Sequence, residues 1–188
     1  MDSSSAIGPV LRAARLDLSL TLDALARRCG VSRAMISKIE RGESQPTAAL
    51  LGRLCAGLGL DLHQVFQPAA PHPAPVSRAA EQATWRDPAT GYVRRNLTPP
   101  GAPSRMRLTH VELPAGARVA FDLPWSERRL DQQVALIEGA LDMTVGAATH
   151  RLSAGDCLHM TLDEPAAFHN PGETPARYIV AVVMLEGR

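Results

Sequence analysis

The sequence predicts a multidomain α + β protein, in which an all-α N-terminal domain precedes an all-β C-terminal domain. In the first third of the chain apolar residues recur at helical spacing, whereas further on short β-type runs alternate with Gly and Pro. Between them, residues 67–82 contain four prolines, which can neither continue a helix nor join a central strand. We therefore expect domains at residues 1–67 and 84–188, joined by a linker at residues 68–83.

The N-terminal domain is expected to contain five short helices. Hydroxyl side chains that can cap a helix N-terminus precede the second, third and fourth of them, at Thr21, Ser32 and Thr47. Gly30 and Gly42 end the second and third helices, because glycine adopts the left-handed conformation at little cost. The expected helices cover residues 7–17, 22–30, 33–42, 48–59 and 62–66.

The link between the second and third helices is very short. The stretch "RRCGVS" leaves room for a turn of three to four residues, which is the spacing of a helix-turn-helix. Residues 27–41 hold five basic residues against one acid, Glu40, a net charge of +4, whereas the whole chain carries only +1. On the third helix Ile36 and Ile39 would face the core, and the polar face would be free to bind DNA. A merely solvated face is the alternative, since short helix-turn-helix shapes also occur without DNA.

The stretch "LRAARLDLSLTLDALARRCGVSRAMISKIERGESQPTAALLGRLCAGLGLDLHQVF" resembles the phage-repressor, or XRE-type, DNA-binding domain. Its most specific part is "GVSRAMISKIERG", which a proline follows closely. The resemblance implies that the third helix reads base edges and that Arg15 and Glu40 form a partly buried ion pair joining the first helix to the third. The DNA-binding residues that it implies are Thr21, Arg33, Ala34, Ser37, Lys38 and Arg41.

The chemistry of these side chains suits DNA. Arg33 can pair with a guanine edge through two hydrogen bonds, Lys38 can donate to guanine O6 or N7, and the methyl group of Ala34 suits a thymine methyl. Thr21 and the N-terminus of the second helix offer donors to a phosphate oxygen. Arg41 adds a contact to the DNA backbone that depends on salt concentration.

Eight β-type runs make up the strand candidates of the C-terminal domain. Turns separate them about every 8 to 12 residues, which predicts a sandwich or barrel rather than alternating strands and helices. The candidates are residues 91–97, 105–113, 117–123, 132–139, 140–146, 149–156, 157–162 and 176–185.

The segment "DQQVALIEGALDMTVGAATHRLSAGDCLHMTLDEPAAFHNPGETPARYIVAVV" resembles the cupin domain. Within it, "ALIEGALDMTVG" matches a pair of strands that turn at a glycine, here Gly139, and "PAAFHN" matches the end of the second cupin motif. The resemblance implies a cupin (double-stranded β-helix) barrel over about residues 104–185.

The resemblance also indicates where a metal would be bound. Metal-binding cupins use two His and a Glu from the first motif and one His from the second. Here the Glu position, six residues before Gly139, is Gln133, and no His-x-His precedes it, so that only His169 matches a ligand. One imidazole beside a neutral amide is a poor site for a divalent cation. We therefore expect no metal and no cofactor.

The barrel mouth is expected to bind a small molecule instead, as a mostly apolar cavity with a few convergent polar groups does. Arg129 would favour a carboxylate or another anion, and Trp125 could close over an apolar or cationic portion. His63, by contrast, is expected at the surface. The residues expected to line the mouth are Trp125, Arg129, Gln133, His169, His110 and Met160.

Cysteine usage and the chain start favour a cytoplasmic protein. The first residues lack the basic and apolar regions of a signal peptide, and no run approaches the ~18 apolar residues that span a bilayer. Cys29, Cys55 and Cys157 are odd in number and far apart, so we expect three buried, reduced thiols.

The two domains together resemble those of bacterial one-component regulators. We expect a transcriptional regulator rather than an enzyme: a homodimer that binds double-stranded operator DNA and responds to a small-molecule effector. No Ser/His/Asp arrangement, Gly-rich phosphate loop or pair of carboxylates stands out in the sequence. Two alternatives remain open: a metal-dependent cupin enzyme fused to a DNA-binding domain, and a constitutive DNA-binding protein whose barrel only dimerises.

Overall fold

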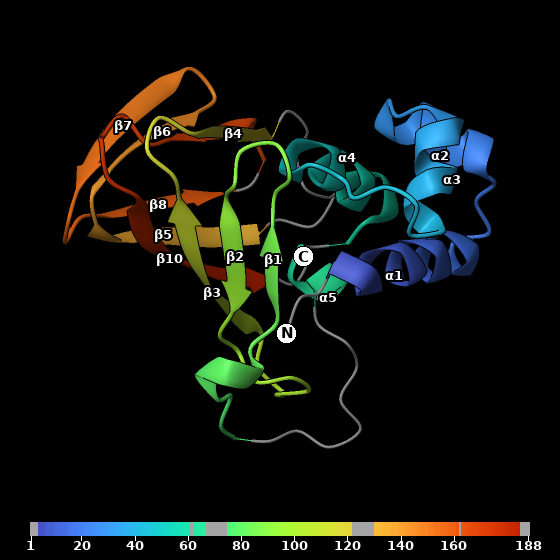
Figure 1. The fold of residues 1–188 in the computed structure, drawn as a ribbon, viewed down its shortest axis with the longest axis horizontal. Coiled ribbons are helices and arrows are strands. Elements are labelled where there is room, and N and C mark those ends of the chain that lie inside the picture. Colours follow the sequence, from blue (N-terminus) through green and yellow to red (C-terminus); the bar gives the residue numbers. More distant parts are fainter. Residues whose placement is uncertain (1–3, 61, 67–74, 122–129, 162, 185–188) are drawn as a thin grey trace.

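A computed structural model describes residues 4–60, 62–66, 75–121, 130–161 and 163–184 of the chain (Figure 1). The described residues form five α-helices followed by ten β-strands, which confirms the expected α + β architecture. Figure 1 shows the helices gathered on one side of the molecule and the strands on the other. We refer to the helices α1–α5 as the helical domain and to the strands β1–β10 as the β domain.

The helices begin and end close to where the sequence places them. Thr21, Ser32 and Thr47 each accept a hydrogen bond from the backbone N–H three residues later, which confirms them as caps. Gly30 ends the second helix with a φ of 66°. None of the described helices is long and apolar enough to cross a bilayer. The helices are α1 (Ser4–Asp17), α2 (Leu22–Cys29), α3 (Arg33–Glu40), α4 (Ala48–Leu58) and α5 (Leu62–Phe66).

A buried ion pair joins α1 to α3. The Arg15 guanidinium donates from Nε and Nη2 to the two carboxylate oxygens of Glu40, both at 2.7 Å, and from Nη1 to the Leu20 carbonyl at 2.9 Å. The side chains are only 10% and 6% exposed, so each charge depends on the other. A β-carbon on Gly8 would lie 2.4 Å from the Ile39 carbonyl oxygen, which shows how closely α1 approaches the end of α3. The ion pair implied by the XRE resemblance is confirmed.

The strands form two antiparallel sheets, one with the order β1-β2-β3-β10-β5-β8 and one with the order β4-β9-β6-β7. All eight strand candidates are present, and the short strands β1 and β9 are additional. Along β3, Thr109, Val111 and Leu113 are buried while the alternate residues are partly exposed, so one face of each sheet forms the core. The strands are β1 (Thr84–Arg86), β2 (Val93–Asn96), β3 (Met106–Leu113), β4 (Arg118–Phe121), β5 (Leu130–Glu138), β6 (Ala140–Val145), β7 (Ala148–Ser153), β8 (Cys157–Thr161), β9 (Ala166–His169) and β10 (Ala176–Met184).

The helical domain packs directly on the β domain. The ring of Phe66, the last residue of α5, stacks on Trp85 of β1 with the ring centroids 5.2 Å apart. Beside this stack, the buried Asp87 carboxylate accepts a hydrogen bond from the Ala48 backbone N–H at 3.2 Å, in the first turn of α4. Asp87 therefore adds a cap to α4 from the β domain. We call this contact, made by Phe66, Trp85, Asp87 and Ala48, the domain seam.

The buried ion pair yields a stability prediction. Glu40→Gln should lower the free energy of unfolding of the helical domain by about 3–5 kcal/mol, because the buried Arg15 guanidinium loses the charge that compensates it. Unfolding in urea, followed by far-UV circular dichroism, measures the change. Glu43→Gln is the matched control, since it removes a carboxylate from the exposed pair with Arg41 and should leave unfolding unchanged. Equal losses in both variants would contradict a role specific to the buried pair.

Candidate functional site

The exposed face of α3 is the first candidate site. Three residues, Gly30 to Ser32, separate α2 from α3, as a helix-turn-helix requires. Ile36 and Ile39 on one face of α3 are each 1% exposed, whereas Arg33, Ala34 and Lys38 on the other are exposed. Figure 1 shows α2 and α3 at the end of the helical domain away from the strands, so the β domain of the same chain does not cover this face.

Arg33 and Thr21, two of the expected DNA contacts, are held only weakly by other residues of the chain. Arg33 makes only a loose ion pair with Asp23, at 3.7 Å from Nε to Oδ1, and both side chains are more than half exposed. The Thr21 hydroxyl oxygen accepts a hydrogen bond from the Ala24 N–H at 3.1 Å. Because a hydroxyl both accepts and donates, Thr21 still has a proton to donate to a phosphate at the N-terminus of α2.

Arg41 is held differently from the other expected contacts. Its Nε and Nη2 donate to the Glu43 carboxylate at 2.6 and 2.8 Å, and its Nη1 donates to the Ser37 hydroxyl. The hydrogen bonds between Arg41 and Glu43 raise the pKa of Arg41 and lower the pKa of Glu43. Arg41 must therefore release Glu43 before a phosphate can take its place, whereas the Ser37 hydroxyl, which accepts here, still has a proton to donate. Sequence reasoning missed Glu43, although it stands only two residues after Arg41.

Met35 is a second residue of this face that sequence reasoning missed. Its side chain is 37% exposed in the first turn of α3, between the expected contacts Ala34 and Ser37. Its position next to Arg33 and Ala34 at the start of the helix could have indicated that it belongs to the same face. A thioether there offers an apolar contact to a thymine methyl.

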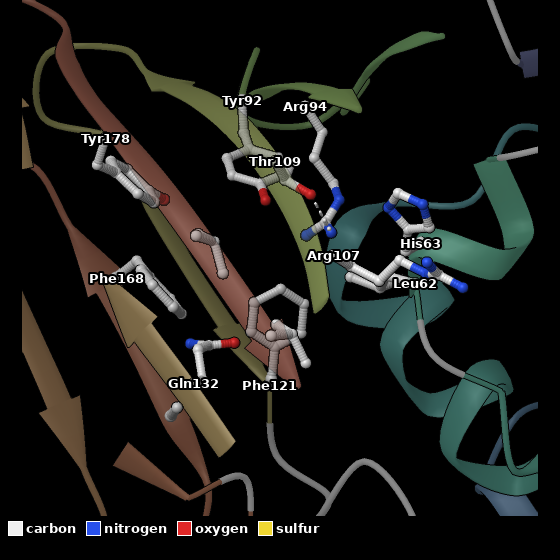
Figure 2. Close-up of a pocket in the computed structure, with 13 residues that line it drawn as sticks. Leu62, His63, Tyr92, Arg94, Arg107, Thr109, Phe121, Gln132, Phe168 and Tyr178 are labelled. Carbon is white, nitrogen blue, oxygen red and sulfur yellow. Dashed lines mark hydrogen bonds between the residues drawn. The ribbon is translucent and has the colours of Figure 1, made fainter. Parts of the chain in front are cut away.

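The second candidate site is a cavity of about 50 Å³ between the two sheets and helix α5 (Figure 2). By volume it has room for a few water molecules. Both sheets and the helical domain contribute to its wall. The lining residues are Leu62, His63, Tyr92, Arg94, Arg107, Thr109, Phe121, Gln132, Ala166, Phe168, Tyr178, Val180 and Val182.

One part of the cavity wall is aromatic. Phe168 stacks on Tyr178 with centroids 5.9 Å apart, and Phe121 meets the edge of Phe168 at 6.1 Å. Burial raises the pKa of Tyr178 well above its ordinary value, so the phenol stays protonated. Gln132 is buried and donates to the sulfur of Met160 at 3.5 Å. This part of the wall thus offers a neutral, mostly apolar surface with one amide.

Three residues expected at the barrel mouth do not line this cavity. Gln133 is exposed on the outer face of β5, and His110 and His169 point away from the lining residues Thr109 and Phe168. Successive strand residues point to opposite faces, so a position that is wrong by one moves the side chain to the other side of the sheet. In each case the chain neighbour lines the cavity instead: Gln132, Thr109 and Phe168.

The other three expected residues have different outcomes. Met160 is 5% exposed and accepts a hydrogen bond from Gln132, but it lines a second pocket beside β8 and not this cavity. Trp125 and Arg129 lie outside the described residues. His63, expected at the surface, is 3% exposed and lines the cavity. Because α5 packs against the β domain, the outward face of its sequence pattern is covered.

The two residues at cupin metal-ligand positions do not come together. Gln133 lies on β5 of one sheet and His169 on β9 of the other. His169 Nδ1 lies 3.7 Å from the Asp142 carboxylate, whose pKa is lowered chiefly by its hydrogen bond from Arg151 and also by His169. Among the described residues no group of three or more His, Cys, Asp or Glu could hold a metal ion. The described residues therefore do not fit a cupin metal.

The cysteines differ from expectation at one position. Cys29 and Cys55 are buried in the helical core, as expected. Cys157, at the start of the edge strand β8, is exposed. The prediction of three buried thiols is wrong there, because Cys157 lies on the outer face of the sheet, where its Sγ is 4.0 Å from Oε1 of the exposed Gln133.

Comparison with known proteins identifies both domains. The helix-turn-helix profile matches residues 11–65, and the cupin domain profile matches residues 109–182. The HTH-type transcriptional regulator SutR of Escherichia coli (strain K12) is 26% identical over 172 residues, which are 92% of this chain and 91% of that protein. The transcriptional regulator ClgR of Mycobacterium tuberculosis is 38% identical over 85 residues, which are 45% of this chain and 75% of that protein.

A solved structure matches the fold along the whole chain. The crystal structure of an HTH_3 family transcriptional regulator from Vibrio cholerae superposes with a TM-score of 0.78 at 23% identity, and the match covers 98% of each chain. The two chains therefore share the same overall fold. The chain thus carries an XRE-type helix-turn-helix domain followed by a C-terminal cupin domain, and it is similar over most of its length to an HTH-type transcriptional regulator.

Proposed function

We propose that the protein is a one-component regulator that works without a metal or cofactor and is not an enzyme. A homodimer reads double-stranded operator DNA with α3, and the cavity of the β domain binds a small metabolite that changes operator affinity. The observation that carries this proposal is that helix α5 of the helical domain forms part of the cavity wall. A protein that binds a chromosomal operator would work in the cytoplasm.

The division of the chain into two domains supports separate DNA-binding and ligand-binding domains. Helix α5 ends at Phe66 and β1 begins at Thr84, so we place the linker at residues 68–83, between domains at residues 1–67 and 84–188. In the first domain the exposed basic face of α3 contacts the DNA. Its base contacts come from Arg33, Ala34, Ser37 and Lys38. Thr21 and Arg41 supply the phosphate contacts.

Dimerisation follows from the size of one reading helix. A single α3 of eight residues reaches only a few base pairs, and two linked copies raise the effective concentration of the second contact. In a two-fold dimer the two α3 helices would sit about 34 Å apart and enter successive major grooves. We assign the dimer contact to the β domain, because α2 and α3 must face DNA.

The effector would act by binding one arrangement of the two domains better than another. Couplings of about 1–3 kcal/mol, typical of allosteric proteins, correspond to a change in operator affinity of about 5- to 150-fold. The domain seam supports such coupling, because the stack of Phe66 on Trp85 and the cap from Asp87 to Ala48 join the domains next to the cavity.

Arg33→Ala should weaken binding to the operator by about 1–3 kcal/mol and relax the preference at one base pair. Fluorescence anisotropy with an operator selected from a random duplex library, and with single-base variants of it, measures both effects. Arg12→Ala is the control, because Arg12 is exposed on α1, away from α3. If Arg33→Ala binds every duplex as the wild type does, α3 does not read bases as assigned.

Glu43→Gln should raise the affinity for any duplex several-fold. The variant removes the carboxylate that binds Arg41, so that a phosphate no longer has to replace it. We also expect the slope of log affinity against log salt to steepen by about one counterion. Anisotropy measured over a range of salt concentrations checks this. Unchanged affinity and slope would show that Arg41 does not contact the DNA backbone.

The cavity predicts different effects for two adjacent glutamines. Any compound that stabilises the wild type by binding in the cavity should lose much of its effect in Gln132→Ala and keep it in Gln133→Ala, because only Gln132 faces the cavity. Thermal-shift measurements with a panel of amino acids, carboxylic acids and polyamines provide the test. Equal losses in both variants, or no stabilising compound at all, would argue against an effector site here.

A further inference from the structure

Two guanidinium groups at the cavity, those of Arg94 and Arg107, have no counter-charge among the described residues. Arg94 donates from Nη2 to the Thr109 hydroxyl at 3.1 Å, while its Nε is buried without a hydrogen-bond partner. Arg107 donates to the backbone carbonyl of Ser104. Neither makes an ion pair with a carboxylate within the described part of the chain. Arg15, Arg41, Arg151 and Arg177, in contrast, each bind one.

Both arginine side chains at the cavity are only partly buried, but the Nε of Arg94 is buried, and a buried donor without an acceptor is unfavourable. A guanidinium group binds a carboxylate through paired, charge-assisted hydrogen bonds, which are about twice as strong as neutral ones. The free Nε of Arg94 is one such donor. An anionic ligand would therefore supply from outside what the chain supplies to its other arginines.

The rest of the cavity defines the body of the ligand. Phe168, Tyr178 and Val180 present apolar surface, and the protonated phenol of Tyr178 adds no charge. Figure 2 shows Arg94 and Arg107 at the end of the cavity beside the helices, and Phe168 and Tyr178 on the side of the strands. The volume of about 50 Å³ admits only a small molecule. The combination fits a carboxylate group with a short apolar body.

The charged end of the cavity is also its boundary with the helical domain. Leu62 and His63 of α5 lie beside Arg94 and Arg107 (Figure 2). Both are buried and line the cavity together with these arginines. A ligand that neutralises the arginines would therefore also contact α5.

We propose that this cavity binds a small monocarboxylate between Arg94 and Arg107 of the β domain and helix α5 of the helical domain. The inference rests on the proposed role of the cavity as the effector site and adds the chemical class of the effector. Because the ligand touches both domains, its affinity depends on how α5 is seated, and by linkage DNA binding and ligand binding must affect each other.

Butanoate and butanamide are the matched probes, since they share a short apolar body and differ in charge. With the full-length protein, we expect butanoate at millimolar concentrations to raise the melting temperature and to bind in calorimetric titrations, and butanamide to do neither. Inorganic phosphate, an anion without an apolar body, should bind at least tenfold more weakly than butanoate.

Arg94→Met should reduce butanoate affinity at least tenfold. Arg95→Met is the control, because it removes the same charge from the next residue of β2, whose side chain lies on the other face of the sheet and pairs with His110. The pKa of His110 is lowered chiefly by burial and also by the charge of Arg95. Arg94→Lys tests for misfolding: it keeps the charge and should retain part of the binding. Equal losses in Arg94→Met and Arg95→Met would overturn the assignment.

Variants of α5 test the contribution of the helical domain. Leu62→Ala should lower butanoate affinity several-fold although it lies outside the β domain, whereas Gln64→Ala, at an exposed position of the same helix, should not. Unchanged butanoate affinity in Leu62→Ala would contradict the proposal that α5 forms part of the ligand site.

The probes separate this inference from the proposed function. Suppose that butanoate fails to bind, but a neutral compound stabilises the wild type and not Gln132→Ala. The cavity is then still an effector site, and the proposal that the effector is a carboxylate is wrong. If phosphate binds as tightly as butanoate and its binding depends equally on Arg94, the proposal that the ligand has an apolar body is wrong. If no compound of any charge binds, both proposals fail.

Discussion

The domain seam is the contact on which both candidate sites depend. The Asp87 carboxylate is buried and accepts hydrogen bonds from Ala48 across the seam and from Ala89 and Thr90 within its own turn. Separating the domains would remove the partner at the first turn of α4 and expose the stacked rings of Phe66 and Trp85 to water. The cavity would then lose the part of its wall that α5 provides. The seam therefore links the integrity of the cavity to the position of the helical domain.

A signal from the cavity to DNA does not need a chain of small shifts inside the helical domain. The helices there are held in close contact: a β-carbon on Gly57 of α4 would lie 3.0 Å from the β-carbon of Cys29 of α2, and Arg15 fixes α1 to α3 through Glu40. So tightly packed a unit moves as a whole more easily than it deforms. In a dimer, reseating α5 would change the separation of the two α3 helices, and the spacing of major grooves makes operator binding sensitive to that separation.

The helical domain could be predicted closely from the sequence, and the cavity could not. Helix caps and the buried positions of α3 follow from local chemistry and a period of 3.6 residues, so a small error in the boundary of a helix leaves its faces correct. A strand has a period of two, and the choice of Gln133 over Gln132 placed the side chain on the wrong face of β5. The burial of His63 was missed for another reason. The sequence of a helix does not show whether a second domain covers one of its faces.

The arginines of the cavity show the limit of reading residues by type. Nineteen of the twenty basic residues are arginines, and nothing local distinguishes Arg94 from Arg95 or Arg107 from Arg105. Their roles follow from what surrounds each guanidinium in the fold. Arg15 is buried beside a carboxylate that the chain itself provides, so its charge serves the structure. Arg94 lines a cavity and leaves its Nε without a partner among the described residues, and in the proposed carboxylate site a ligand supplies the negative charge.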